Sequence, residues 1–202
     1  MIKNIVFDIG NVLVDFRWRE YMKDLGFSDE VTKHLGKNMV MNPLWDELDR
    51  GLRPKAEVIE EMKSFVPGYE KEADLFFQNI EEIVITRPYA KSWLKQLRNQ
   101  GYKIYLLSNY PPDLFEIHSK ERFDFLGEID GMVVSGFVKM VKPEPEIYEC
   151  LFQKYHLIPE ECVFLDDRQV NIDAAVEMGM TGILFKDYDT ARRELINILE
   201  GK

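Results

Sequence analysis

The sequence has few of the residues that build disulfide or zinc sites. Only two of its 202 residues are cysteines, Cys150 and Cys162, and they do not form a Cys-x-x-Cys pair. Neither a disulfide framework nor a thiolate zinc site is therefore expected, and we interpret both cysteines as reduced core thiols of a cytoplasmic protein. Histidine is also scarce, with three residues, so a metal site in this chain would depend on oxygen ligands.

Excess positive charge and long apolar runs are missing as well. The formal net charge is -10, and no cluster of Lys and Arg offsets it locally, which argues against a nucleic-acid partner. No apolar run approaches the ~20 residues that span a bilayer, and Asp8 interrupts the first apolar run, so we expect neither a membrane span nor a signal peptide. Hydrophobic residues make up 46% of the chain and charged residues 31%, which is typical of a folded globular protein.

Short apolar, β-branched runs alternate with helical patterns along most of the chain. The runs predict strands at residues 2–7, 103–107, 132–134, 162–165 and 182–185. Helical periodicity covers residues 90–100, 146–155 and 173–178. Strands that alternate with helices in this way indicate crossover units. They predict an α/β fold with a Rossmann-like three-layer core around a central parallel sheet.

Residues 17–85 interrupt this alternation. They contain helical patterns at 18–25, 30–35, 43–50, 55–65 and 72–80, and no convincing strand. We expect a small helical cap domain here, inserted after the first strand into a core made of residues 1–16 and 86–202. Loops at the carboxyl ends of parallel strands border the ligand crevice, so the insert is well placed to act as a lid. A structural helical layer without a gating role is the alternative.

Polar and charged residues end four of the predicted strands or follow them closely. They are Asp8, the pair Ser108 and Asn109, Lys142, and the pair Asp166 and Asp167. In a parallel sheet these positions share one edge, where carboxylates would repel one another and lose their hydration. A divalent cation would offset that repulsion, and a ligand set of oxygens favours Mg²⁺.

Four motifs in this order carry a resemblance to a known family. FDIGNVLVD, LLSN, VKPEPEIY and FLDDRQVNIDAA resemble the motifs of the haloacid dehalogenase-like (HAD) hydrolase superfamily, in its form with a small helical cap. The DIGNV form is most similar to a subgroup of bacterial sugar-phosphate phosphatases. The resemblance implies a Mg²⁺-dependent phosphomonoesterase for a small phosphate ester, with a sugar phosphate such as glucose-1-phosphate favoured. A dehalogenase would use the same aspartate without a metal, and the Asp166–Asp167 pair disfavours that reading.

The resemblance also implies roles for individual residues. Asp8 would be the nucleophile that forms an aspartyl-phosphate, and Lys142 would stabilise charge on the transferring group. Mg²⁺ would be held by Asp8, the carbonyl oxygen of Gly10 and Asp167. The remaining implied contacts are Asp166 as a water-mediated or outer metal ligand, Asn171 near the water shell of the metal, and Ser108 with the amide of Asn109 on phosphoryl oxygens.

Gly10 departs from the common pattern of the superfamily. A second aspartate usually stands there, protonates the leaving oxygen and later activates water, which is typically worth about 10²- to 10⁴-fold in rate. Glycine still offers a carbonyl oxygen but transfers no proton. Three outcomes follow: a slow phosphatase, a substrate with a good leaving group, or an acid supplied from elsewhere, such as the cap or water. Asp15 is close in sequence, but we expect it to anchor the start of the cap. A non-catalytic or very slow binding module also stays open.

The cap should select the substrate. Its candidate residues lie in MNPLWDELDRG: Asn42, Trp45, Asp46 and Glu47. Trp45 would either stack on a sugar face or be buried in the cap core. Arg168 would either contact phosphate or be solvated.

Overall fold

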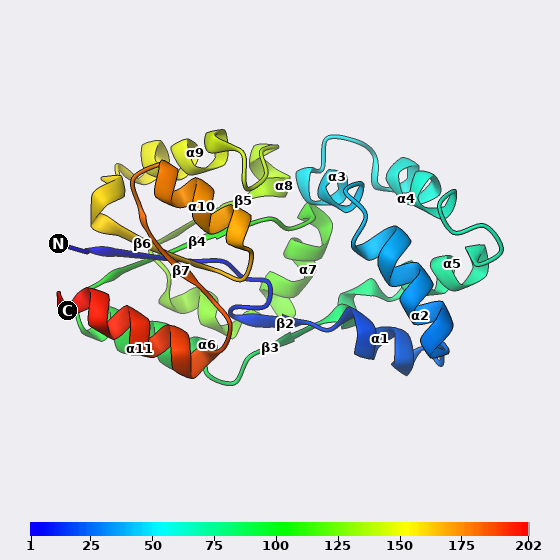
Figure 1. The fold of residues 1–202 in the computed structure, drawn as a ribbon, viewed down its shortest axis with the longest axis horizontal. Coiled ribbons are helices and arrows are strands. Elements are labelled where there is room, and N and C mark those ends of the chain that lie inside the picture. The colour runs from blue at the N-terminus through cyan, green and yellow to red at the C-terminus, as the bar shows by residue number, and fades with distance from the viewer. Residues whose placement is uncertain (202) are drawn as a thin grey trace.

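The computed structural model describes residues 1–201 and consists of two lobes that lie side by side (Figure 1). The larger lobe contains a five-stranded parallel sheet with the strand order β5-β4-β1-β6-β7. Its strands are β1 (Asn4–Phe7), β4 (Lys103–Ser108), β5 (Gly131–Val134), β6 (Cys162–Asp166) and β7 (Thr181–Leu184). All five predicted strands are present, and this parallel sheet confirms the predicted fold class.

Helices cover both faces of the sheet. In Figure 1, α9 (Pro145–Tyr155) and α10 (Gln169–Glu177) lie above it, and α6 (Ala90–Asn99) and α11 (Tyr188–Leu199) lie below it. The central strand β1 is buried on both faces by these helices. Its side chains alternate in direction, so neighbouring residues enter different halves of the core. Ile5 and Phe7 join the core with α6 and α11, whereas Val6 joins the core with α9 and α10.

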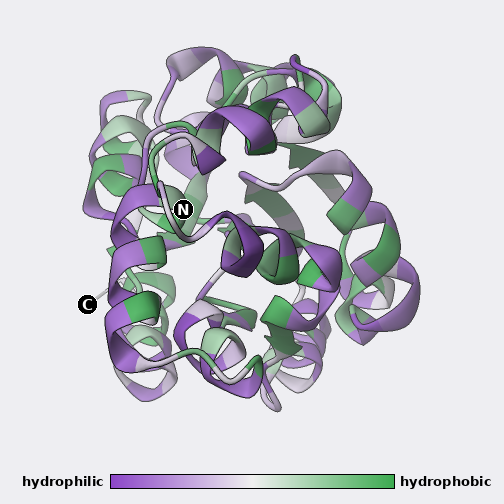
Figure 2. Cartoon of the chain, turned by 90° about the vertical axis from the view of Figure 1, so that its right-hand side faces the viewer, coloured by the Kyte–Doolittle hydropathy of each residue, from purple (hydrophilic) through white to green (hydrophobic). Residues whose placement is uncertain are grey.

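The predicted helix at residues 90–100 illustrates how sequence sets these layers. Trp93, Leu94 and Leu97 recur at helical spacing and are buried, and Trp93 meets the ring of Phe7 edge to face at 4.9 Å. Gly101 follows with φ +95°, a conformation that glycine adopts without steric cost. The helices alternate hydrophobic and hydrophilic residues along their length (Figure 2), as helices that cover one face of a core do.

Several short elements and two long helices were not anticipated. The helix α11 has a recognisable signal: Asp187 caps it by accepting from the Thr190 N–H, and its apolar residues Ala191 and Leu195 are one turn apart. The other helices of this lobe are α7 (Pro112–Glu121), α8 (Ser135–Val138) and the 3₁₀ turns Asp124–Glu128 and Pro159–Glu161.

The smaller lobe consists of helices that form where the patterns predicted them. They are α1 (Trp18–Asp24), α2 (Asp29–Leu35), α3 (Trp45–Arg50), α4 (Lys55–Lys63) and α5 (Glu70–Gln78), with a π turn at Gly36–Val40 and a 3₁₀ turn at Ile80–Ile83. Met22, Leu35, Val58, Met62 and Phe76 are buried within it. No helix in residues 1–201 is both long and apolar enough to cross a lipid bilayer.

The expectation that residues 17–85 contain no strand is wrong at their end. The strand β3 (Val84–Thr86) pairs antiparallel with β2 (Val14–Phe16), and this ribbon joins the two lobes (Figure 1). Each strand has three residues, too few for a periodic signal, and they pair because the chain enters and leaves the smaller lobe at one place. Across the ribbon, Asp15 forms an ion pair with Arg87 at 3.2 Å, in line with an anchoring role.

Candidate active site

Three carboxylates converge at the carboxyl ends of the two central strands. Asp8 follows β1, Asp166 ends β6, and Asp167 comes next in the chain. One carboxylate oxygen from each lies within 4.8 Å of those of the other two. Asp166 is fully buried and Asp8 is 7% exposed. The sequence predicted this convergence from the parallel order of the strands.

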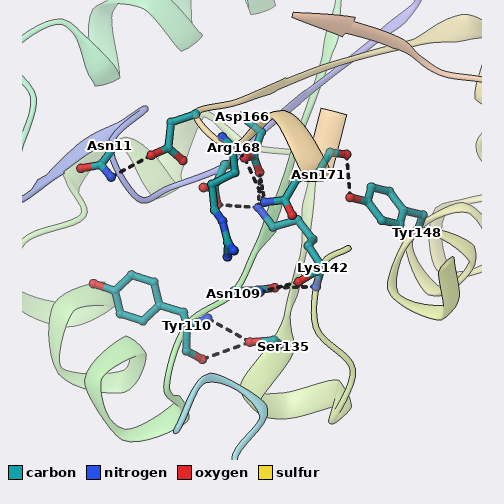
Figure 3. Close-up of polar contacts among 11 residues, drawn as sticks. Asn11, Asn109, Tyr110, Ser135, Lys142, Tyr148, Asp166, Arg168 and Asn171 are labelled. Carbon is teal, nitrogen blue, oxygen red and sulfur yellow. Dashed lines mark hydrogen bonds and ion pairs between the residues drawn. The ribbon is translucent and has the colours of Figure 1, made fainter. Parts of the chain in front are cut away.

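Lys142 lies between two of these carboxylates. Its Nζ is 2.9 Å from Asp8 Oδ1 and 2.5 Å from Asp166 Oδ2, and the residue is 2% exposed. The side chain of Asn109 fixes the Lys142 backbone, accepting from its N–H at 2.8 Å and donating to its carbonyl at 3.0 Å (Figure 3). The Asn109 side chain is therefore occupied by Lys142, and the expected contact of the Asn109 backbone amide with phosphate remains a prediction.

Burial and charge shift the ionisation of this group. Burial raises the pKa of Asp8 most; the charge of Lys142 lowers it, the charges of Asp166 and Asp167 raise it, and a contact with Ser108 lowers it, so that the pKa lies at about 7. Burial by itself would lower the pKa of Lys142, but Asp166 and Asp8 raise it above its usual value, so the ammonium stays charged. Burial also raises the pKa of Asp167. One lysine therefore does not neutralise the three carboxylates.

The donor set fits a hard divalent cation. Carboxylate oxygens of Asp8 and Asp167 and the backbone at Gly10 border the same cavity, and oxygen ligands are those that Mg²⁺ prefers. The side chain of Asn11 holds Asp167 in place, because its Nδ2 donates to Asp167 Oδ2 at 2.8 Å (Figure 3). Its Oδ1 accepts from the Phe16 N–H at 3.2 Å.

Asp166 is saturated by protein donors. Besides Lys142, it accepts from Asn171 Nδ2 at 3.0 Å on both oxygens and from the Arg168 N–H at 2.8 Å. Asn171 is held in turn by the hydroxyl of Tyr148, which donates to its carbonyl at 2.8 Å (Figure 3). This network indicates that Asp166 positions Lys142. A metal contact through water remains a prediction, as does the placement of Asn171 near that water.

Sequence reasoning gave no role to Asn11 or Tyr148. Asn11 has φ +56°, a left-handed conformation that asparagine tolerates better than most residues. A glycine and an asparagine directly after a strand-ending aspartate are the signal that could have indicated this turn. Tyr148 is on α9, and its contact with Asn171 depends on how α9 packs beside α10, so no local pattern predicts it.

Ser108 ends β4 with a hydroxyl that lacks a full partner. The residue is completely buried, and among residues 1–201 its Oγ meets no group with hydrogen-bond geometry, although it lies close enough to Asp8 to lower the pKa of that carboxyl. A buried polar atom without a partner is costly in free energy. The expected contact of Ser108 with a phosphoryl oxygen, which would remove that cost, remains a prediction.

A cavity of about 450 Å³ lies over these groups, between the two lobes. Its floor contains Asp8, Gly10, Lys142, Asp167 and Asn171, and Asn109 and the otherwise exposed Arg168 border it. The smaller lobe contributes Asn42, Trp45, Asp46 and Asp49. Between floor and roof the wall is mainly apolar: Val14, Phe16, Val40, Met41, Ile83, Val84 and Leu114. Glu47 is absent from this lining and instead pairs with Arg50 at 3.5 Å.

Trp45 is part of the aromatic packing of the cap as well as of the cavity wall. Its ring stacks on Phe77 at 6.4 Å between centroids and meets Phe16 edge to face at 5.8 Å. The ring is partly buried, because it packs in the cap while it also borders the cavity. Stacking on a sugar remains a prediction for the part that borders the cavity.

Polar contacts hold the smaller lobe over the cavity. Arg50 on α3 forms a two-point ion pair with Glu144, at 2.9 and 2.5 Å, and Lys55 on α4 pairs with Asp113 at 2.5 Å. Lys139 Nζ donates to the carbonyl of Gly51 at 2.7 Å. These contacts place α3 against the site side of the larger lobe.

The raised pKa of Asp8 predicts that the site destabilises the metal-free fold. A carboxyl whose folded-state pKa exceeds its unfolded value stabilises the fold only while protonated, and that contribution is lost as the pH rises through about 7. Asp8→Asn should therefore stabilise the metal-free protein at pH 8, by on the order of 1–4 kcal/mol, and by less at pH 5. Urea unfolding in EDTA at both pH values measures this, and a less stable variant at pH 8 would contradict it.

Taken together, the parallel core, the helical lobe and the aspartate–lysine centre define an α/β enzyme with a Rossmann-like core and a helical cap over its active site. The chain belongs to the haloacid dehalogenase-like hydrolase family, whose model matches residues 2–179. This membership confirms the resemblance that the four motifs carry.

Two curated relatives that match along nearly their whole length are phosphatases. The chain is 28% identical to a sesquiterpene phosphatase of Aspergillus oryzae, over 92% of this chain and 90% of the relative. It is 29% identical to a D-ribitol-5-phosphate phosphatase of Bacteroides thetaiotaomicron, over 98% and 99%. Among solved structures, a HAD family enzyme of B. thetaiotaomicron in complex with magnesium is 25% identical, with a TM-score of 0.70 and coverage of 95% and 98%.

Proposed function

We propose that this protein is a Mg²⁺-dependent phosphomonoesterase that forms an aspartyl-phosphate on Asp8. The observation that carries the proposal is the cluster of Asp8, Asp166 and Asp167 beside the buried ammonium of Lys142. A carboxylate nucleophile, a fixed cation and further carboxylates for a metal are the groups that phosphoryl transfer through an acyl phosphate requires. The phosphatase relatives support the same reaction.

Each residue of the site has a proposed role in this reaction. Asp8 attacks phosphorus, and the ester oxygen leaves with the alcohol. Lys142 stabilises charge on the phosphoryl oxygens and orients Asp8. The hydroxyl of Ser108 and the amide of Asn109 donate to the phosphoryl oxygens, and Arg168 at the cavity edge adds positive charge. Asp8, the carbonyl of Gly10 and Asp167 would hold Mg²⁺, which when bound offsets the repulsion between carboxylate and phosphate.

The alcohol portion of the substrate would occupy the space below the cap. A small sugar phosphate such as glucose-1-phosphate is our first candidate. The polar side chains of Asn42, Asp46 and Arg168 and the border position of Trp45 support it. The apolar wall favours a second class, esters of an apolar or aromatic alcohol. The D-ribitol-5-phosphate and sesquiterpene phosphatase relatives represent the two classes. The two free thiols support a cytoplasmic location.

A panel of phosphate esters assayed with and without Mg²⁺ tests the proposal. We expect phosphate release that EDTA abolishes and Mg²⁺ restores, because three crowded carboxylates and one lysine leave the site with excess negative charge for a phosphate dianion. The panel should contain hexose-1- and hexose-6-phosphates, pentitol phosphates, isoprenoid phosphates, nucleotides and p-nitrophenyl phosphate. Release that is equal in EDTA and Mg²⁺ would contradict a metal-dependent mechanism. No release from any ester would favour the alternative of a binding module.

A further inference from the structure

Asp49 is a carboxylic acid in the cavity that the roles above leave unused. It is in the last turn of α3, borders the cavity from the cap side, and is 8% exposed. Its backbone is fixed, because its carbonyl accepts from Ser135 Oγ at 2.6 Å and α3 ends at Gly51 with φ +63°. The carboxyl group is thus held between the helical lobe and the catalytic floor.

The surroundings of Asp49 favour its neutral form. Burial raises the pKa of Asp49 well above its ordinary value, and the charges of Asp46 on α3 and Asp8 after β1 raise it further. The positive charges of Lys142, before α9, and Arg168, before α10, lower the pKa of Asp49, each by less than either aspartate raises it. Tyr110, after β4, is also a titratable neighbour, since the charge of Asp49 raises the pKa of its hydroxyl. Within residues 1–201 no Lys or Arg forms an ion pair with Asp49, so no fixed cation opposes the protonation of this carboxyl at the cavity.

On the core side of the cavity, position 10 is a glycine and offers no carboxylic acid beside Asp8. A Cβ added at Gly10 would meet only Asp8 Oδ2, at 3.9 Å, so the space that a side chain would fill there is open. Asp15 points into the β2–β3 ribbon and does not line the cavity. Asp46 also lines the cavity, and burial raises its pKa, but the charges of Arg168 and Arg50 lower that pKa and favour the ionised form. Asp49, by contrast, is buried at the cavity, and the negative charge of Asp8 raises its pKa.

We propose that Asp49 is the general acid and base of this enzyme and supplies from the cap the proton transfer that Gly10 cannot perform. This inference rests on the proposed phosphatase function. In the first step Asp8 forms a bond to phosphorus, the P–O bond to the alcohol breaks, and Asp49 gives its proton to the departing oxygen. In the second step the Asp49 carboxylate takes a proton from the water that attacks phosphorus. Phosphate leaves, and Asp8 and protonated Asp49 are regenerated.

The dependence of rate on the leaving group tests this role. Asp49→Asn keeps the shape of the side chain and removes the transferable proton. We expect kcat/KM to fall by about 10²- to 10⁴-fold on the best alkyl phosphate of the panel. On p-nitrophenyl phosphate, whose phenolate needs no proton, the fall should be less than about tenfold. The basic limb of the pH profile on the alkyl ester, where the acid form of Asp49 is lost, should disappear in the variant.

Two further variants and a trapping experiment complete the test. Asp46→Asn removes a carboxyl three residues earlier on the same helix and should change both rates by one common factor. Gly10→Asp in the Asp49→Asn background should restore the alkyl-ester rate at least tenfold, because an acid returns to the open space beside Asp8. Trapping of Asp8 by beryllofluoride, observed by ¹⁹F NMR, should be retained in Asp49→Asn, which shows that the fold and the nucleophile are intact.

The outcomes separate this inference from the proposed function. Equal losses on alkyl and aryl esters in Asp49→Asn would overturn the role of Asp49 and leave the phosphatase function standing. Wild-type activity confined to aryl esters would also overturn the role of Asp49 and leave the phosphatase function standing. A loss that depends on the leaving group in Asp46→Asn but not in Asp49→Asn would transfer the role to Asp46. No phosphate release by the wild-type protein on any ester would overturn the proposed function and this inference with it.

Discussion

Replacing Asp8 with Asn is expected to lower Mg²⁺-dependent phosphate release by at least about 10⁴-fold, because the amide cannot form the acyl phosphate. The change is nearly isosteric, and Lys142 keeps its second partner, Asp166, at 2.5 Å. The folded structure should therefore persist while the chemistry is lost. Phosphate release under saturating ester, together with acid-quench detection of a phosphorylated enzyme, measures the effect.

Asp15→Asn is the matched control for Asp8→Asn. Asp15 is seven residues further along, pairs with Arg87 in the β2–β3 ribbon and does not border the cavity. Its replacement should change the rate by less than about threefold, since an exposed ion pair is worth at most about 1 kcal/mol. A phosphorylated enzyme in Asp8→Asn, or a rate within tenfold of the wild type, would show that another residue is the nucleophile.

Replacing Lys142 with Met should impair both catalysis and stability. The variant loses the fixed positive charge on the transferring phosphoryl group, which is expected to lower kcat by about 10²- to 10³-fold. It also leaves Asp8 and Asp166 buried without their cation. Removing one partner of a buried ion pair typically costs about 3–5 kcal/mol of unfolding free energy. The loss should be smaller at pH 5 than at pH 8, because Asp8, with a pKa of about 7, is neutral at pH 5.

Urea unfolding at the two pH values and a steady-state assay measure these effects. Lys103→Met is the control: Lys103 is at the other end of β4, has a side chain that is 62% exposed and pairs with Asp130. Its loss should cost less than about 1 kcal/mol and leave kcat unchanged. Similar stability losses in both variants would contradict the cost of the unpaired buried carboxylates. An unchanged kcat in Lys142→Met would remove Lys142 from the mechanism.

Much of the fold and the floor of the site could be predicted because their signals are local. Strands such as β1 and β6 are continuous apolar runs, which in an α/β pattern indicates a parallel sheet buried on both faces. Parallel strands bring their carboxyl ends to one edge, so Asp8, Ser108 and Asp166 were expected together and are together. The four motifs added the family, which the match over residues 2–179 confirms.

The supporting contacts could not be predicted in the same way. The Asn171–Asp166 bonds and the Tyr148–Asn171 bond depend on how α9 and α10 pack on the sheet. Likewise, the packing of the Trp45 ring against Phe77 and Phe16 joins residues from three separate segments, which no local pattern predicts.

The sequence by itself determined a parallel α/β core, a helical insert and an aspartate–lysine centre, because each follows from the periodicity or order of neighbouring residues. Only the tertiary structure decided how the insert meets that centre. The ribbon of β2 and β3, the Arg50–Glu144 pair and the position of Asp49 over the floor all join residues far apart in the chain. Their energies depend on burial and distance, which no local pattern records.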